Sequence, residues 1–380
     1  MIAIQIWHEF GVLQYNVAAR CFLYACLTGS LIDTFGKIVI MRIGLKQFIK
    51  RKLRRASVYH AVGIAYTADQ VLLCALRNKK GEYTWALDAS FSHQSWQEKL
   101  PAYVKKEGLA GAPCFFALSS HWYRIHQVDK PNVSDTELFD ALQWPIKEIA
   151  GSDKEIVYDY SDMPVQVAGQ NKVMAVAIAK EEVAKLTNAI YLADLDLRSI
   201  VVEELATVHL VSNKNEAVIT LVQEHGEVVV LNIVKDNKLY FSRRLKGFEN
   251  IGGFSEVELD MGLTESMCVQ IQRSMDFFES QLRQAPIKRI LLKLDSPHIS
   301  FLSSRISESM GVVCEAFEPN IICAEGFNFK MASFSCLGAA YTGALTTLSA
   351  DSTKQSENIA DENKSNVNTP NKEATMELTS

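Results

Sequence analysis

The feature that most constrains the fold is a pattern of elements that occurs twice along the chain. Each copy has three strand-like segments joined by short polar turns, followed by a helix-like segment and a further apolar strand. The first copy begins near Val58 and the second near Ala217. The copies share this order of elements and have negligible sequence identity. The pattern therefore predicts an α/β protein whose two lobes face a cleft.

The expected strands of the two copies are Val58–Ala65, Val71–Leu76, Tyr83–Phe91, Ala217–Val222, Val228–Val234 and Leu239–Leu245. After the first set we expect a helix over Trp96–Glu107, broken by Pro101 because proline lacks the backbone N–H that a helix interior needs. After the second set, apolar residues recur every three or four positions from about Val257 to Leu282. This spacing predicts one long helix with a buried face.

These elements divide the chain into lobes and flanking segments. We expect the first lobe over residues 58–205, with an inserted subdomain at about 119–193, and the second lobe over residues 206–347. Residues 348–380 are rich in Ser, Thr, Asn, Glu and Lys and have almost no large apolar side chain. Such a tail cannot bury enough surface to offset its ordering entropy, so we expect it to be disordered.

The first forty residues contain one apolar run that is too short to cross a membrane. Cys21–Ile32 spans twelve residues between Arg20 and Asp33, whereas a spanning helix needs about 20. No small-residue cleavage site follows, as a signal peptide requires. We interpret residues 1–40 as an over-extended gene start, with Met41 as the initiator. A membrane-associated leader is the alternative.

The next segment, residues 41–57, is basic and amphipathic. It carries seven Lys or Arg residues and no acid between Met41 and Arg55, with Leu45, Phe48 and Leu53 among them. This pattern is typical of a segment that binds an anionic membrane surface, although a solvated terminus has the same composition.

Composition excludes two other classes of function. The net charge is −5, which argues against a general nucleic-acid binder. The eight cysteines form no CxxC pair and no Cys/His cluster, so structural zinc is not expected. Most of them lie in apolar runs, as reduced core cysteines of a cytosolic protein do.

Several local sequences, taken in order, resemble the actin-like ATPase superfamily in the branch that contains FtsA and the type IV pilus protein PilM. Val128–Ile149 and then Glu155–Val165 resemble the inserted subdomain of PilM-like proteins. Leu231–Gly247 resembles the hairpin of their second lobe, and Cys336–Leu345 resembles their closing small-residue helix. The resemblance covers about Val58 to Leu345 and implies a two-lobed actin-like fold with duplicated β-meanders.

The resemblance also implies a function in pilus assembly. PilM-like proteins capture a short amino-terminal segment of a PilN-like inner-membrane protein, in a groove between the first lobe and the inserted subdomain. Within the branch, this sequence is most similar to components of the mannose-sensitive haemagglutinin (MSHA) pilus. We therefore expect a cytoplasmic scaffold, peripheral at the inner face of the cytoplasmic membrane. Leu138 and Trp144, on the helix that begins at Ser134, are candidates for the partner groove.

An actin-like ATPase holds phosphate and Mg²⁺ between two hairpins, each with an Asp-x-Gly sequence. Glycine lets backbone N–H groups approach the phosphates, and the carboxylate holds the metal and its waters. In the first hairpin of this chain, Ala65 takes the place of the aspartate and Thr67 that of the glycine. The loop expected to wrap the adenosine begins with Asp295 and Ser296 and has no glycine.

The second hairpin departs from the same pattern. Aligned on the strand that follows, Gln223 replaces the aspartate and His225 replaces the glycine. A slip of one residue would bring Glu224 and Gly226 into these positions, but it would turn Glu224 to the other face of the strand. We expect Glu224, and Asp69 in the first hairpin, to be solvated turn residues.

With both carboxylates lost, we expect no catalytic residue, no bound metal and no efficient ATP hydrolysis. The alternative is a nucleotide-binding actin-like ATPase of the same pilus machinery, which would bind ATP and Mg²⁺ at these degenerate positions.

Overall fold

The computed structural model describes residues 3–4, 57–151, 154–212 and 215–346. The expected start at Met41, the basic amphipathic segment before residue 57 and the tail after residue 346 lie outside the described residues.

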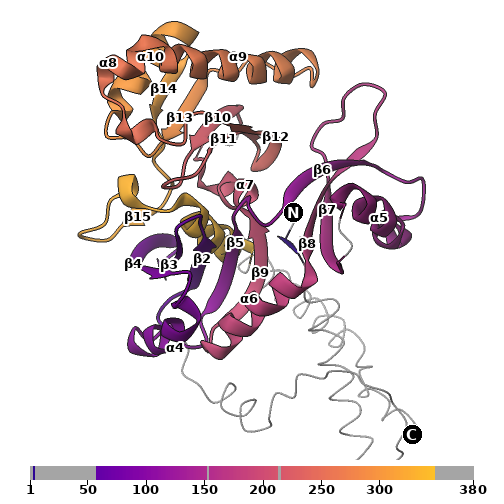
Figure 1. Cartoon of the computed structure of the whole chain (residues 1–380), viewed down its shortest axis with the longest axis vertical. Coiled ribbons are helices and arrows are strands. Elements are labelled where there is room, and N and C mark those ends of the chain that lie inside the picture. Colours follow the sequence, from indigo (N-terminus) through magenta and orange to yellow (C-terminus); the bar gives the residue numbers. More distant parts are fainter. Residues whose placement is uncertain (1–2, 5–56, 152–153, 213–214, 347–380) are drawn as a thin grey trace, which may run out of the picture.

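The first lobe is built on a seven-stranded sheet in the order β1-β9-β5-β2-β3-β4-β15. Its strands are β1 (Ala3–Ile4), β2 (Ala61–Tyr66), β3 (Gln70–Lys79), β4 (Glu82–Ser92), β5 (Pro113–Leu118), β9 (Asp196–Val202) and β15 (Ile322–Cys323). Strands β2, β3 and β4 form an antiparallel meander, and β5 and β9 continue the sheet in parallel with β2. Figure 1 shows this lobe as the lower part of the molecule, beneath the second lobe.

The second lobe repeats this topology in a five-stranded sheet, in the order β12-β11-β10-β13-β14. Its strands are β10 (Val218–Val222), β11 (Val229–Lys235), β12 (Lys238–Leu245), β13 (Arg289–Lys293) and β14 (Val313–Ala316). The order matches β4-β3-β2-β5-β9 of the first lobe, again with an antiparallel meander followed by two parallel strands. The duplicated meander that the sequence predicts is thus present.

Helices cover both sheets. They are α4 (Trp96–Lys106), α6 (Lys180–Leu192), α7 (Glu203–Ala206) and η1 (Val208–Leu210) in the first lobe, and η2 (Ile251–Gly253), α8 (Glu256–Glu258), η3 (Leu259–Leu263), α9 (Thr264–Ser280) and α10 (Ile299–Met310) in the second. A short turn, η4 (Phe329–Met331), precedes the last helix of the chain.

Two expectations about these helices are wrong. Helix α4 runs through Pro101 without a break, since the buried Leu100 and Val104 hold the turns on either side of it. The long helix expected from Val257 is divided at Gly262, whose φ of 115° lies outside the helical range. Beyond this kink, the face of α9 that carries Met267 is buried, as the spacing predicts.

The inserted subdomain is a three-stranded sheet with one helix. Its strands β6 (Arg124–Asp129), β7 (Ile156–Asp162) and β8 (Lys172–Ala179) are ordered β6-β8-β7, and α5 (Asp135–Ala150) covers one face of this sheet. The other face packs against the first lobe through Val176 and Ile178. We expected the insertion to extend to residue 193. Instead it ends with β8, because Leu186 and Ile190 of α6 lie in the core of the first lobe.

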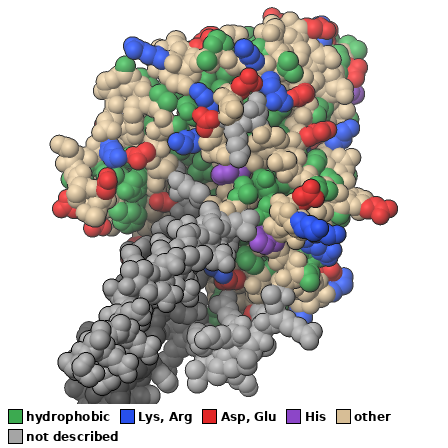
Figure 2. Space-filling view, turned by 180° about the vertical axis from the view of Figure 1, so that it is seen from behind, with side chains coloured by type: hydrophobic (Ala, Val, Ile, Leu, Met, Phe, Trp, Pro, Cys, Tyr) green, Lys and Arg blue, Asp and Glu red, His purple; other side chains and the backbone are tan. Residues whose placement is uncertain are grey.

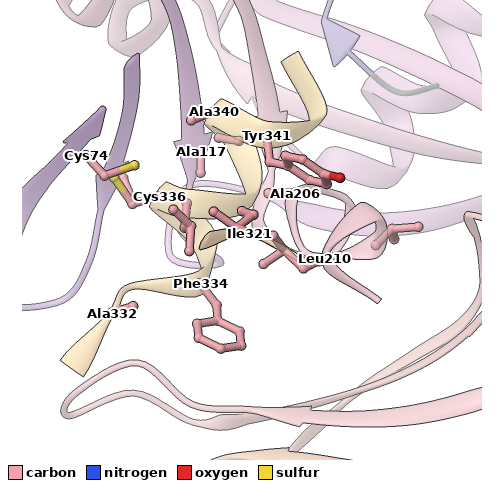
Figure 3. Packing of buried hydrophobic residues seen from close by; sticks show 14 of the residues in the cluster. Cys74, Ala117, Ala206, Leu210, Ile321, Ala332, Phe334, Cys336, Ala340 and Tyr341 are labelled. Atoms are coloured by element: carbon pink, nitrogen blue, oxygen red, sulfur yellow. The ribbon is translucent and has the colours of Figure 1, made fainter. Parts of the chain in front are cut away.

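The chain returns to the first lobe at its end, which differs from the expected second lobe of residues 206–347. Strand β15 pairs with β4, and a helix over residues 334–346 packs onto the sheet of the first lobe. Figure 3 shows this closing helix, in yellow, with Cys336 and Ala340 beside Cys74 and Ala117. Glycine on both sides permits the close approach. A Cβ added at Gly63 of β2 would lie 2.1 Å from the Cys336 carbonyl oxygen, and one added at Gly338 of the helix would lie 2.3 Å from the Ala206 carbonyl oxygen.

The surface carries charges of both signs, and Figure 2 shows acidic and basic side chains interspersed over one face. Within the described ranges, no helix is both long enough and apolar enough to cross a membrane. The cysteines described are all free thiols, and all but Cys323 are buried.

Candidate functional site between the two lobes

The first cleft hairpin is the turn that joins β2 to β3. The backbone N–H and the side-chain hydroxyl of Thr67 both donate to the Gln70 carbonyl, at 3.0 and 2.9 Å, and these bonds close the turn. The Ala65 side chain is buried in the apolar cluster that the two lobes share. The residues that replace Asp and Gly are therefore structural. The hairpin presents the backbone N–H of Ala68 to the second lobe.

In the second hairpin, Gln223 is buried at the end of β10 and ties three segments together. Its Nε2 lies 2.8, 3.0 and 3.1 Å from the carbonyl oxygens of Glu227, Phe248 and Glu249. Its Oε1 accepts the N–H of Asp295 at 3.2 Å. Both ends of the amide are occupied by backbone groups. The side chain expected in place of the metal-binding aspartate thus holds the second lobe together.

Glu224 points to the other side of the turn and reaches the closing helix. Its Oε1 accepts bonds from the Ser333 hydroxyl at 3.0 Å and from the Ser335 N–H and hydroxyl at 3.0 and 2.9 Å. A carboxylate here satisfies free N–H groups at the start of the helix and interacts favourably with its dipole. We expected a solvated acid, and this was wrong, because the helix that covers Glu224 lies more than 100 residues further along the chain. Asp69 is exposed, as expected.

Glu227 joins the two hairpins directly, and sequence reasoning missed it. Its Oε1 accepts the N–H of Ala68 at 2.7 Å and lies 3.4 Å from the Ser119 hydroxyl. A carboxylate of the second lobe therefore binds a backbone N–H of the first-lobe hairpin. The contact spans 159 residues of sequence, so no local pattern marks it. The one local signal is that an acid directly follows the His225–Gly226 turn.

A second polar contact joins the lobes beside this one. Arg244 of β12 donates to the carboxylate of Glu204 at 3.0 Å and to the Ser120 carbonyl at 3.4 Å. The Tyr123 hydroxyl donates to Glu204 and accepts the Glu203 N–H at 3.1 Å. Glu204 is only 2% exposed, so this ion pair is largely shielded from water. Nothing in the local sequence marks Glu204 for this contact.

Three carboxyl side chains, together with apolar and neutral polar residues, line the small cavity that remains between the lobes. It is lined by Glu203, Thr207, Val222, Glu224, Glu227, Val228, Val230, Asn232 and Ser335. Burial raises the pKa of Glu203 well above its usual range, and the charges of Glu204 and Glu227 raise it further. Burial also raises the pKa of Glu227, against the lowering effect of the Ala68 N–H. Glu203 and Glu227 therefore lose their protons less readily than exposed glutamates do.

The loop expected to wrap the adenosine follows β13 and packs against η2 of its own lobe. A Cβ added at Gly252 would lie 2.2 Å from the Asp295 carbonyl oxygen, so the loop and η2 are in direct backbone contact. The Ser296 hydroxyl accepts the N–H of His298 at 3.2 Å. His225 is exposed, and its Nδ1 lies 2.7 Å from the Asp295 carboxylate. Gly226 has a φ of 70°, which suits glycine at this tight turn.

The chemistry open to this cleft follows from its side chains. Triphosphate oxygens need N–H donors, cations or a metal. Here the Ala68 N–H is taken by Glu227, and the Arg244 guanidinium is taken by Glu204. In the described part of the chain, no group of three or more His, Cys, Asp or Glu side chains is arranged to hold a metal ion. The residues brought together serve to join the lobes.

The two residues expected in a partner groove do not lie together. Leu138 is buried in the core that α5 forms with its sheet. Trp144 is 72% exposed on the outer surface of α5, which lies on the side of the inserted subdomain away from β9 (Figure 1). Leu138 therefore cannot line a groove between the subdomain and the first lobe. The face of the subdomain that meets the first lobe is the opposite face of its sheet.

Comparison with solved structures identifies similar folds. A chain of a PilM–PilN type IV pilus biogenesis complex is similar with a TM-score of 0.57 and 18% identity, over 76% of this chain and 99% of that chain. The cytoplasmic domain of EpsL, an inner-membrane component of the type II secretion system of Vibrio cholerae, has a TM-score of 0.43 and 6% identity, over 75% and 94%. A Bacteroides thetaiotaomicron protein of unknown function with an actin-like ATPase fold has a TM-score of 0.42 and 8% identity, over 68% and 91%. No family model and no curated protein matches the chain.

The fold is therefore the expected two-lobed actin-like one: two α/β lobes with duplicated meanders and a subdomain inserted into the first. Within that class, the arrangement is similar to that of a chain in the PilM–PilN complex.

Proposed function

We propose that this protein is a non-catalytic cytoplasmic scaffold of a type IV pilus assembly machine. It acts as the PilM-like component, and in the MSHA pilus this component is MshI. Its role is to bind the cytoplasmic tail of a PilN-like inner-membrane protein.

The contact between Glu227 and Ala68 carries the non-catalytic part of this proposal. In a hairpin built to bind phosphate, backbone N–H groups are the donors that receive the anion. Here a carboxylate of the protein itself receives the Ala68 N–H at 2.7 Å. A phosphate group would have to displace Glu227 from the Ala68 N–H and then lie in a cavity that Glu224 also lines, where a second carboxylate would repel it. This arrangement favours lobes that stay joined over lobes that close on a nucleotide.

The similarity of the fold to a chain of the PilM–PilN complex supports the partner. An inserted subdomain packed beside the first lobe offers the two walls that a groove for a peptide tail needs. Trp144 remains a candidate contact for a second component, because a large exposed aromatic side chain is a common interface anchor.

The proposed location is the inner face of the cytoplasmic membrane. The partner's tail and the basic segment of residues 41–57 would provide two weak attachments, which together hold far better than either alone. The basic segment contributes at most about 1 kcal/mol per base near the surface, and salt screens it. A tail held by apolar contacts is insensitive to salt.

Thermal shift measurements on the full chain test the proposal. We expect a rise in melting temperature with a synthetic peptide of the tail of the PilN-like protein from the same genome, and no rise with Mg-ATP. A rise with Mg-ATP alone would favour the alternative, a nucleotide-binding actin-like ATPase of the same machinery. A matched variant, Val269→Asp, changes a residue that is 45% exposed on α9, which lies on the side of the second lobe away from the first lobe (Figure 1), and it should respond as the wild type does.

Pull-down from membranes at rising salt tests the location. With the partner present, the protein should remain bound at high salt. A protein that is fully cytosolic when the partner is present would contradict the scaffold role.

A further inference from the structure

We infer that Glu203 holds a proton at neutral pH, and that this proton supplies the hydrogen-bond donor that the cavity between the lobes lacks. The contact between the lobes is thereby sensitive to pH, and it weakens when Glu203 is ionised. The inference concerns this contact alone and does not depend on the proposed function.

Two acceptor atoms at the cavity carry the inference. Glu203, at the start of α7, and Asn232, on β11, both line the cavity, and they are only 7% and 1% exposed. Among the residues that the structure describes, none donates to Oε1 of Glu203 or to Oδ1 of Asn232. The hydroxyl of Thr220, opposite Asn232 on β10, has no partner either and does not fill this role. Because a buried acceptor without a donor costs free energy, the cavity requires a donor.

The size of the cavity favours a proton as that donor. Its volume is about 10 Å³, which is close to the minimum for a single water molecule. Within the described ranges, no three His, Cys, Asp or Glu side chains are arranged to hold a metal ion. A proton needs no additional room, and on Glu203 it converts one of the two acceptors into a donor.

The charges around Glu203 also favour the protonated form. Burial raises the pKa of Glu203 well above its usual range, and the charges of Glu204, Glu227 and Glu224 raise it further. The charge of Arg244 acts in the opposite direction. That guanidinium is bound to the Glu204 carboxylate at 3.0 Å, so the cation nearest to Glu203 already balances another acid.

Two other titratable side chains lie in this region. Burial raises the pKa of Tyr123 well above its usual range, so it stays neutral, and the exposed His121 acts on the charge of Glu227. The sign of the pH effect follows from Glu203. Because its folded-state pKa is raised, the stability that it contributes is fully present below the unfolded pKa of about 4.3 and is lost as pH rises through the folded pKa.

Urea denaturation of the full chain across pH tests the inference. Glu203→Gln replaces the proton with a permanent N–H donor. The unfolding equilibrium constant of the wild type, divided by that of this variant, should rise about tenfold per pH unit between about pH 5 and pH 7. The matched variant Glu265→Gln changes an exposed carboxylate of α9, and the corresponding ratio should not change with pH. A ratio for Glu203→Gln that is equally constant would overturn the inference.

Infrared spectroscopy detects the proton without relying on stability. At pH 7 the wild type should show the C=O stretch of a protonated carboxyl group that is lost in Glu203→Gln and kept in Glu265→Gln. In Asn232→Ala this band should shift, because the acceptor of its hydrogen bond is removed. A spectrum that is the same for the wild type and Glu203→Gln would mean that Glu203 is ionised, and the inference would be wrong. A band that does not shift in Asn232→Ala would also contradict it, because the proton would then lie away from this cavity.

Melting temperatures in different salts separate a proton from a metal cation. A proton on Glu203 predicts equal melting temperatures in NaCl, KCl and choline chloride at the same ionic strength. A higher melting temperature with Na⁺ or K⁺ that disappears in Glu203→Gln would show that a metal ion neutralises this carboxylate, and it would overturn the inference.

Discussion

The two cleft hairpins occupy equivalent places in two lobes of the same topology, yet they are used differently. The hairpin of the first lobe closes its own turn through Thr67 and Gln70 and presents one backbone N–H, that of Ala68. The hairpin of the second lobe carries three buried polar side chains, Gln223, Glu224 and Glu227. Gln223 binds within its own lobe, and the two glutamates bind the closing helix and the first hairpin.

This difference indicates what the cleft is built to do. A pair of hairpins that share a nucleotide should both present donors to the space between them. Here one hairpin presents a donor and the other presents its acceptor, so the two complement each other. The duplicated fold is retained, but the two hairpins bind each other directly, through Glu227 and the Ala68 N–H. This cleft is therefore a joint, a contact that holds the two lobes together.

The largest expected effect comes from removing Glu224. Glu224→Ala should lower the free energy of unfolding by about 2–4 kcal/mol, because it deprives Ser333 and Ser335 of their buried acceptor and uncaps the closing helix. The matched change in the first hairpin, Asp69→Ala, removes an exposed acid and should cost less than about 0.5 kcal/mol. Urea denaturation of both variants measures the difference. Similar losses for the two would mean that the hairpins are not as unequal as their contacts indicate.

A second effect concerns pH and the joint itself. The folded-state pKa of Glu227 is raised by burial, so its contribution to stability is fully present below the unfolded pKa of about 4.3 and is lost as pH rises through the folded pKa. Glu227→Gln keeps an oxygen acceptor for Ala68 and removes this loss. At pH 8 the variant should be more stable than the wild type by about 1 kcal/mol, and near pH 4 the two should converge. Thermal melts across this range test it, and parallel pH profiles would contradict the role of the buried charge.

The smallest effect is expected at His225, which is 77% exposed beside Asp295. An exposed polar contact of this kind contributes between about 0 and 1 kcal/mol. His225→Ala should therefore change the free energy of unfolding by a few tenths of a kcal/mol, less than any change at Gln223. A large loss on urea denaturation would show that the loop after β13 depends on this histidine.

Much of the fold could be predicted from periodicity. The strand patterns of both meanders predicted β2–β4 and β10–β12, because alternation and turn residues are local signals. The return of the closing helix to the first lobe could not be predicted, because it depends on a close contact between Gly63 and Cys336 that spans 273 residues. The end of the insertion at β8 likewise depends on where α6 packs.

In the candidate site, too, local features could be predicted from the sequence and contacts between distant residues could not. The sequence predicted that Ala65 and Gln223 would replace acidic residues, because that follows from aligning two hairpins. It did not predict what fills the cleft. Glu227 and Glu204 act across the lobes, and their partners Ala68 and Arg244 are distant in sequence.

Mg-dependent ATP turnover by the purified full chain tests the central claim, that the cleft is a joint closed by the protein's own carboxylates. We predict that the wild type releases phosphate no faster than a Gln223→Ala control, and that neither rate depends on Mg²⁺. A clear Mg-dependent turnover in the wild type that is lost on Glu227→Gln or Asp69→Ala would contradict the claim and show that the two hairpins form a working nucleotide site.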